Sequence, residues 1–297
     1  QIPDLNLPLQ KAKFMYTEMY ILPFTINKWN KTTEEEKLIS LTQNEVNYFS
    51  RKLLEDYDAK RPGKIFQEKI RINNDDALCL QTAVANLREI RGEKVIGYKI
   101  GCVGRLSQQK MGLSSPVLGR LWTNELYQNG AILKKSNYTN PGMEAEFGIK
   151  LNRDIKPNLA SFEYILASIK SIHPVIEIHN LIFYGNPPNG AELIANNAIH
   201  AGVVLGQPIE RPAISINTDL KLFFDNNLIG SWSNKVWPSD ILSKVKWLAI
   251  ELEKLGNILK KGNLILTGAY GLPMTLDDKQ LVQVKSSAFG NVSAIFN

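Results

Sequence analysis

Two glutamates separated by one residue are the first feature of this sequence that points to chemistry. Glu144 and Glu146 lie in a segment where polar and apolar residues alternate with a period of two, so a strand would present both side chains on one face. Carboxylates this close repel each other when they are partly buried, and a divalent cation between them removes the repulsion. The same spacing also fits two glutamates on a solvated sheet face, so both interpretations stay open.

Glu177 extends this pattern, because it lies in an otherwise apolar segment, residues 174–178, where an unpaired carboxylate loses its hydration at a large cost. Three carboxylates and water suit a hard cation such as Mg²⁺ or Mn²⁺ and leave positions for a chelating substrate. His179 lies on the same strand face and is a candidate to join or orient the site, whereas His173 is interpreted as structural. With 3 histidines and 2 cysteines in the chain, a zinc site is not expected.

Lys99 is the fourth candidate, because it lies in an apolar segment between Gly97 and Gly101. Glycines in a strand let another backbone or a ligand approach closely. A desolvated lysine has a lowered pKa and can act as an acid, a base or an anchor for a carboxylate. The alternative is a lysine that points outward from an edge strand, and the residues do not decide between the two.

The segments that must position these residues are strand-rich and begin at Val95. Strands are predicted at residues 95–101, 143–151, 174–178 and 264–267, together with a hairpin at 220–229 and a folded-back pair at 281–296. These strands occur in runs and do not alternate strictly with helices. We therefore predict an α+β fold with a largely antiparallel or mixed sheet.

Helical spacing of apolar residues predicts four helices, and the first two form a helical lead-in over residues 41–92. The first helix covers residues 43–56, and the second is capped by Asn74 or Asp75 and ends near Gly92. The third runs from its cap Ser161 to Ile172 and is closed by His173 and Pro174. The fourth runs from Asp240 to Leu255, with Ser239 as its N-cap.

The first forty residues differ from the rest and are predicted to form an arm outside a domain of residues 41–297. Pro3, Pro8 and Pro23 interrupt aromatic and apolar residues that show no clear periodicity. The sequence starts with Gln1, so we expect that an N-terminal segment has been removed. A cytoplasmic location is predicted, with export as the alternative.

The composition excludes several classes of protein. The 297 residues are 44% hydrophobic and 22% charged, which fits a globular chain and excludes collagen-like, low-complexity and wholly disordered ones. No apolar run reaches the roughly 18 to 20 residues that a membrane helix needs. The 35 basic residues exceed the 29 acidic ones, giving a charge of +6, but they are scattered. Neither nucleic acid nor a membrane is therefore expected as a partner.

Several short motifs resemble one known family in both order and spacing over residues 45 to 297. They are Gly97-Tyr98-Lys99-Ile100-Gly101, Gln108-Gln109, Pro116-x-x-Gly119-x-Leu121, Glu144-Ala145-Glu146, Asn152-Arg153-Asp154, Pro174-x-x-Glu177, Asn197-Ala198, Leu255-Gly256 and Gly262-x-x-Ile265-Leu266-Thr267-Gly268-Ala269. This pattern resembles the 2-keto-4-pentenoate hydratases, 2-oxohept-3-enedioate hydratases and 4-oxalocrotonate decarboxylases, within the fumarylacetoacetate hydrolase superfamily.

The resemblance implies a mixed β-roll with flanking helices and a site built from these motifs. Glu144, Glu146 and Glu177 would hold Mg²⁺ or Mn²⁺, and a small 2-oxo or 2-hydroxydienoic acid would chelate it. Lys99 would anchor the acid or move a proton, and Thr267 is a weaker candidate for holding the substrate carboxylate. The resemblance further implies a homo-oligomer, no organic cofactor and a place in aromatic catabolism.

Several positions depart from the family pattern where it is usually polar. The family often has an acidic residue after Pro116 and a basic residue two positions before Glu144, and this chain has Val117 and Gly142 there. Where the family tends to have Ser-Arg, this chain has Leu181-Ile182. The family pattern Asp-Asn-Ala-Ser is replaced by Asn196-Asn197-Ala198-Ile199. The predicted function is a metal-dependent hydratase-type lyase acting on an acid such as 2-hydroxypenta-2,4-dienoate. The alternatives are a homologue that binds metal and 2-oxo acid with impaired catalysis, and a related decarboxylase or C–C hydrolase.

Overall fold

A computed structural model describes residues 41–297 of the chain except residues 69, 184–188 and 213. These described residues belong to a unit that spans Leu38–Asn297. The predicted arm, residues 1–40, lies outside the described residues, so the boundary between it and the predicted domain 41–297 stays a prediction. None of the described helices combines the length and the apolar character that crossing a membrane requires.

The larger sheet carries the predicted site residues and is mixed, as the sequence indicates. Its strands follow the order β2-β1-β11-β5-β6-β7-β3, with β12 pairing with β5 and β8 with β6; β1 runs parallel to β11, and β3 parallel to β7. The strands are β1 (Val95–Gly101), β2 (Val117–Trp122), β3 (Leu126–Gln128), β5 (Pro141–Leu151), β6 (Ile169–Asn180), β7 (His200–Leu205), β8 (Ile209–Glu210), β11 (Leu264–Leu266) and β12 (Met274–Thr275).

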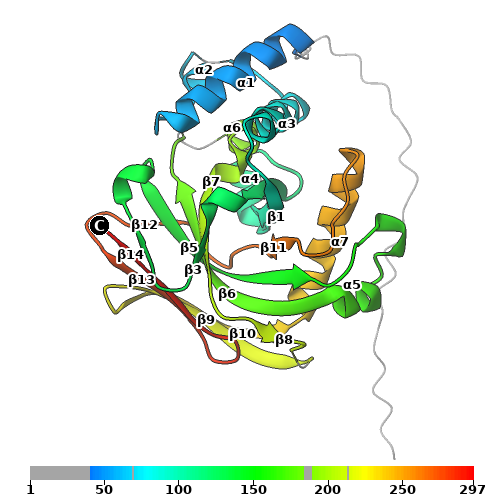
Figure 1. Cartoon of the computed structure of the whole chain (residues 1–297), viewed down its shortest axis with the longest axis vertical. Coiled ribbons are helices and arrows are strands. Elements are labelled where there is room, and N and C mark those ends of the chain that lie inside the picture. Colours follow the sequence, from blue (N-terminus) through cyan, green and yellow to red (C-terminus); the bar gives the residue numbers. More distant parts are fainter. Residues whose placement is uncertain (1–40, 69, 184–188, 213) are drawn as a thin grey trace, which may run out of the picture. The chain divides into compact units, whose positions relative to one another are not determined.

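The second sheet has five strands in the order β10-β9-β13-β14-β4 and packs against the long strands β5 and β6 (Figure 1). The strands are β4 (Ala131–Leu133), β9 (Ile216–Phe224), β10 (Asn227–Trp237), β13 (Leu281–Ser286) and β14 (Gly290–Phe296). Alternate side chains of β9, Leu220, Leu222 and Phe224, are buried between the sheets. This core buries one face of a sheet whose strands are antiparallel except for the parallel pair β4 and β14.

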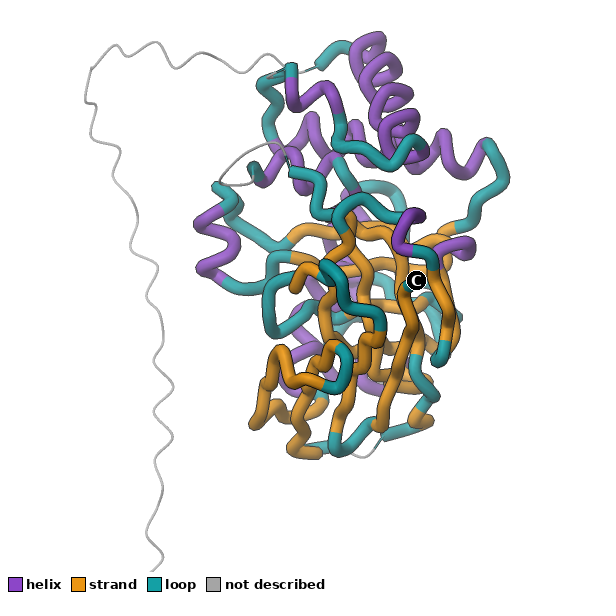
Figure 2. Tube along the Cα trace, turned by 90° about the vertical axis from the view of Figure 1, so that its left-hand side faces the viewer, coloured by secondary structure: helices purple, strands orange, loops and turns teal. Residues whose placement is uncertain are grey.

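The helices form two groups around the sheets. Figure 2 shows most of them gathered at one end of the strands, where α1, α2, α3 and α6 share an apolar core. The helices are α1 (Gln43–Asp58), α2 (Lys64–Gln67), α3 (Asn74–Ile90), α4 (Arg105–Lys110), α5 (Phe162–Ser168), α6 (Gly190–Ala195) and α7 (Ser239–Lys254), with short 3₁₀ turns η1 (Thr123–Glu125), η2 (Lys135–Asn137), η3 (Pro157–Leu159) and η4 (Asn197–Ile199). The second group, α5 and α7, packs together beside the core between the sheets.

One predicted element is wrong in a way that matters for the site. The helix that begins after Ser161 ends at Ser168, and the chain then runs as a single strand from Ile169 to Asn180 through His173 and Pro174. The apolar spacing of this segment fits either structure, but β6 pairs with β5 along almost its entire length. Tertiary pairing of β-branched residues therefore outweighs the helical period.

Two predicted helix caps also differ from the structure. The second helix is capped by Asn73, whose side chain accepts a hydrogen bond from the Asp76 N–H, instead of Asn74 or Asp75. Ser239 is the first residue of α7, and Pro238 occupies the cap position. The cap at Ser161 is confirmed, as are the hairpin of β9 with β10 and the predicted α+β fold with a mixed sheet.

Candidate functional site

The register of β5 against β6 brings the predicted glutamates together. Glu144 lies directly opposite Glu177 in this antiparallel pair, so the two side chains share one face of the sheet. Glu146 follows two residues along β5 on the same face. His179 is on that face too, and its Nε2 lies 2.9 Å from Glu144 Oε2 and 3.5 Å from Glu177 Oε2.

Lys99 reaches this group from β1, an inner strand that lies between β2 and β11. Its Nζ is 3.1 Å from Glu177 Oε1 and donates a hydrogen bond to the Ala198 carbonyl at 3.3 Å. Gly119 lies opposite Lys99 on β2, and a Cβ there would lie 2.9 Å from Lys99 Cγ. The glycine therefore leaves the space through which the lysine side chain passes.

Burial decides between the interpretations that the sequence left open. Glu177 is 0%, Glu146 1% and Lys99 3% exposed. These groups are therefore not on a solvated face, and Lys99 is not an outward lysine of an edge strand. Glu144 is half-buried and lines the cavity described below.

The protonation of the cluster follows from burial and from the charges nearby. Burial lowers the pKa of Lys99, but Glu177, Glu144 and Glu146 outweigh it and raise that pKa above its ordinary value. The lowered pKa expected for a desolvated lysine is therefore wrong, because three carboxylates surround the amine. Burial also raises the pKa of Glu177, yet Lys99, His179 and His200 bring it well below the usual range.

Glu146 has the opposite balance. Burial and the negative charge of Glu177 raise its pKa well above the usual range, and attraction to Lys99 only partly offsets them. The pKa values of the two carboxyl groups are thus shifted in opposite directions. A strongly raised pKa for one of two carboxyl groups that share a buried site is the expected behaviour.

The donor atoms fit a hard divalent cation. Glu146 Oε2, Glu177 Oε2 and His179 Nδ1 are buried without a hydrogen-bond partner. Ligand atoms of Glu144, Glu177 and His179 all lie within 4.8 Å of one another, and the predicted ligand Glu146 is not part of this group. Carboxylate oxygens are the ligands that Mg²⁺ and Mn²⁺ prefer, and a cation bound here would lower the raised pKa of Glu146.

Glu146 and Thr267 are both hydrogen-bonded to the backbone. Glu146 Oε1 accepts a hydrogen bond from the Gly268 N–H. Thr267 is buried and donates its hydroxyl hydrogen to the Phe147 carbonyl at 3.0 Å. Like Glu177, neither residue lines the cavity described below, and the role of Thr267 stays a prediction.

A buried polar network behind Glu177 was not found from the sequence. His200 Nδ1 lies 2.8 Å from Glu177 Oε1, and His200 Nε2 lies 3.9 Å from Glu125 Oε2. Glu125 pairs with Arg88 and accepts the hydroxyl hydrogen of Tyr57 at 2.5 Å. These residues come from β7, η1, α3 and α1, and their separation along the chain leaves no local pattern that could have revealed them.

A cavity of about 580 Å³ opens over Lys99, Glu144 and His179. Part of its wall is η4, where Asn197, Ala198 and Ile199 have φ values of 56°, 51° and 54°. Left-handed backbone costs roughly 1 to 2 kcal/mol for each residue with a Cβ. Strain of this kind collects at functional sites and persists where the surrounding structure enforces it.

The positions that depart from the family pattern have different locations. Val117, Leu181 and Ile199 line the cavity. Gly142 lies under Leu181, since a Cβ at residue 142 would be 2.9 Å from Leu181 Cδ1. Ile182 is buried in the core shared by α1, α3 and α6 and does not line the cavity. The substitutions therefore change the cavity wall more than its charged end.

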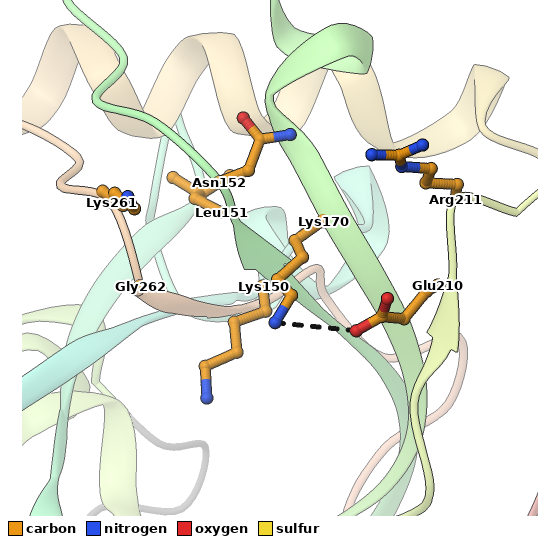
Figure 3. Close-up of a pocket in the computed structure, with 8 residues that line it drawn as sticks. All are labelled: Lys150, Leu151, Asn152, Lys170, Glu210, Arg211, Lys261 and Gly262. Carbon is orange, nitrogen blue, oxygen red and sulfur yellow. Dashed lines mark ion pairs between the residues drawn. The ribbon is translucent and has the colours of Figure 1, made fainter.

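A second cavity, of about 480 Å³, contains none of the predicted site residues. Figure 3 shows Lys150, Lys170, Arg211 and Lys261 around it, with Lys170 Nζ 3.5 Å from Glu210 Oε1. The side chains of this ion pair are 55% and 62% exposed, so water screens them.

No family model matches the chain. A 2-keto-4-pentenoate hydratase of Burkholderia vietnamiensis is 26% identical over 232 residues, which are 74% of this chain and 85% of that protein. The 2-oxo-hept-4-ene-1,7-dioate hydratase of Escherichia coli is 25% identical over 234 residues, which are 76% of this chain and 87% of that protein. The chain is thus a homologue of curated proteins that are named hydratases. The resemblance read from the motifs is thereby confirmed.

The fold of this chain agrees with that of a solved structure. The 4-oxalocrotonate decarboxylase from Pseudomonas putida G7, complexed with magnesium and adipate, superimposes with a TM-score of 0.79 at 19% identity and covers 87% of this chain and 99% of that one. At this identity the likeness shows the fold, and the prediction of a mixed β-roll with flanking helices is confirmed.

Proposed function

We propose that this chain is a divalent-metal-dependent lyase that hydrates a small 2-hydroxydienoate such as 2-hydroxypenta-2,4-dienoate. The observation that carries the proposal is the pair of buried glutamates, Glu146 and Glu177, that lies beside Glu144 and Lys99, and these last two line one end of a cavity. The hydratase names of the homologues support the same class of enzyme. A homo-oligomer stays a prediction.

Glu144, Glu146 and Glu177 would hold Mg²⁺ or Mn²⁺, with His179 orienting Glu144 through the contact of 2.9 Å between Nε2 and Oε2. When bound, the metal supplies Lewis-acid stabilisation of negative charge on the oxygens of a chelating 2-oxo acid. Metal binding would account for the buried Glu146 and Glu177 oxygens that lack hydrogen-bond partners among the described residues.

Lys99 would bind the substrate carboxylate and give a proton to the reacting carbon skeleton. Its ammonium is kept charged by the surrounding carboxylates and is held in place by Glu177 and the Ala198 carbonyl. A lysine that stays protonated can anchor a carboxylate and can donate a proton, but it cannot accept one. Thr267 would hold the carboxylate only if its hydroxyl left the Phe147 carbonyl.

Ultraviolet spectroscopy of the purified full chain tests the proposal. Loss of the 2-hydroxypenta-2,4-dienoate absorbance is expected with Mg²⁺ or Mn²⁺ and not with EDTA. Mass spectrometry of the product separates hydration from decarboxylation or C–C hydrolysis. A dienol that persists at every metal concentration would contradict the lyase, and metal-dependent binding without turnover would identify an impaired homologue.

A further inference from the structure

The cavity over the glutamates has one charged end and one apolar wall. Lys99, Glu144 and His179 form the charged end, and the wall includes Val117, Leu181, Phe183 and Ile199 from separate segments. Among the described residues that line it, Lys99 is the only lysine or arginine. When the carboxylate of a ligand binds Lys99, the rest of that ligand therefore contacts apolar side chains of the wall.

Leu181 has a defined position in this wall. Its N–H donates to the Asn140 carbonyl at 3.2 Å, which fixes the backbone next to β5. The side chain covers Gly142, two residues before Glu144, and a Cβ built on that glycine would lie 2.9 Å from Leu181 Cδ1. Leu181 thus occupies the space that a longer side chain at residue 142 would need.

Val117 closes the wall on the side of Lys99. It pairs with Gly101 across β1 and β2, and a Cβ on Gly101 would lie 3.2 Å from Val117 Cγ2 and 3.3 Å from Lys99 Nζ. Apolar surface therefore begins directly beside the ammonium. The hydroxyl of Tyr270, which also lines the cavity, already donates to Asp240.

The volume of about 580 Å³ lies in the range of cavities that bury drug-sized ligands. A five-carbon dienoate fills only part of this space. The remaining wall is suited to an alkyl or aryl group at the carbon farthest from the carboxylate. A second carboxylate in that position would lose its hydration without a charged partner.

We propose that the cavity selects 2-oxo acids with one carboxylate and an apolar far end, and that Leu181 is a specificity-determining residue that excludes dicarboxylates. This inference rests on the proposed function, because that function places the first carboxylate at the charged end.

Isothermal titration calorimetry with a matched pair of unreactive ligands tests this selection without turnover. 2-Oxohexanoate and 2-oxoadipate have the same chain length and differ in whether the far end is a methyl or a carboxylate. With the full chain in saturating Mg²⁺, we expect 2-oxoadipate to bind at least about 30-fold more weakly, because its second carboxylate must be desolvated.

Two substitutions at one position sharpen the test. Leu181→Arg should reduce the difference between the two ligands by about 10-fold, because a guanidinium can pair with the second carboxylate. Leu181→Met should keep the preference for 2-oxohexanoate. Ile90→Arg adds the same charge at a residue that is 83% exposed and lies outside the cavity, so it should leave both affinities unchanged.

Each outcome separates this inference from the proposed function. Equal affinity of the wild-type chain for both ligands would overturn the selection while leaving the lyase in place. Selective binding of 2-oxohexanoate in a chain that turns over no dienoate would support the selection and remove the lyase. Binding of neither ligand would overturn both, because no 2-oxo acid then occupies the cavity.

Discussion

Two cavities in the described part of the chain contain charged residues in opposite settings. Over β5 and β6 the charges are buried, and several of their atoms lack hydrogen-bond partners within the described part of the chain. Around Lys170 and Glu210 the charges are exposed and water can satisfy them (Figure 3). The second cavity has more cations, yet only the first confines charge where it costs free energy. Burial and not the number of charges marks the site.

The largest effect should come from removing the buried carboxylate that faces Lys99. For Glu177→Gln we expect kcat/KM to fall by at least about 1,000-fold, because a metal ligand worth several kcal/mol of charge stabilisation is lost. Glu210→Gln, in the exposed cavity, is the matched control and should keep wild-type activity.

Stability must be followed in the same experiment. Removing one partner of a buried ion pair costs about 3 to 5 kcal/mol, so the melting temperature of Glu177→Gln should fall. Glu144→Gln keeps the Lys99–Glu177 pair and should lose activity with a smaller loss of stability. Wild-type kcat/KM in both variants would show that these carboxylates do not hold the metal.

Substitution of Lys99 separates substrate binding from metal binding. Lys99→Met should lower kcat/KM by about 100-fold or more, because an acid and carboxylate anchor is lost. Affinity for Mn²⁺ should not decrease, since the ammonium that competes for Glu177 has been removed. A variant that loses Mn²⁺ binding along with activity would show that Lys99 acts through the structure of the metal site.

A smaller effect is expected at His173, whose ring lies between the Ser171 hydroxyl and the Gly206 carbonyl. Burial lowers its pKa, and Lys150 and Lys170 near the exposed cavity lower it further, although the Gly206 carbonyl acts in the opposite direction. The unfolded chain then binds this proton more readily than the folded one. The contribution of His173 to stability is therefore complete above the unfolded pKa of about 6.5 and is lost as the pH falls.

Chemical denaturation between pH 7 and pH 5 measures this contribution. The free energy of unfolding should decrease toward pH 5, with each unit of pKa difference worth about 1.4 kcal/mol. In His173→Gln the decrease should be shallower. Parallel pH dependences of the two proteins would mean that His173 does not titrate differently on folding.

The smallest effect is expected in the exposed cavity. Lys170→Ala removes an ion pair whose groups are more than half exposed, so the free energy of unfolding should change by less than about 1 kcal/mol and kcat/KM should stay at the wild-type value. A tenfold change in kcat/KM would show that the exposed cavity also contributes to the reaction.

The residues of the site were predictable where they lie on regular strands. The period of two placed Glu144 and Glu146 on one face, and the same logic put His179 beside Glu177. The cost of an unpaired carboxylate in an apolar segment identified Glu177 itself. Each of these inferences needs only the geometry of a single strand.

The rest depended on contacts between distant segments. The apolar residues from Ile169 to Ile172 fit a helix until β5 is placed beside them. Likewise, no local pattern joins His200 to Glu125, and none reveals the left-handed turn at Asn197–Ile199. The raised pKa of Lys99 was missed because its sign depends on three carboxylates that only the folded chain assembles.

Titration with Mn²⁺ followed by electron paramagnetic resonance tests whether Glu144, Glu146 and Glu177 hold one divalent cation. We expect one bound ion per wild-type chain, loss of that ion in Glu177→Gln, and unchanged binding in Glu210→Gln. A wild-type chain that binds no Mn²⁺, or a Glu177→Gln variant that binds it as tightly, would rule out this metal site.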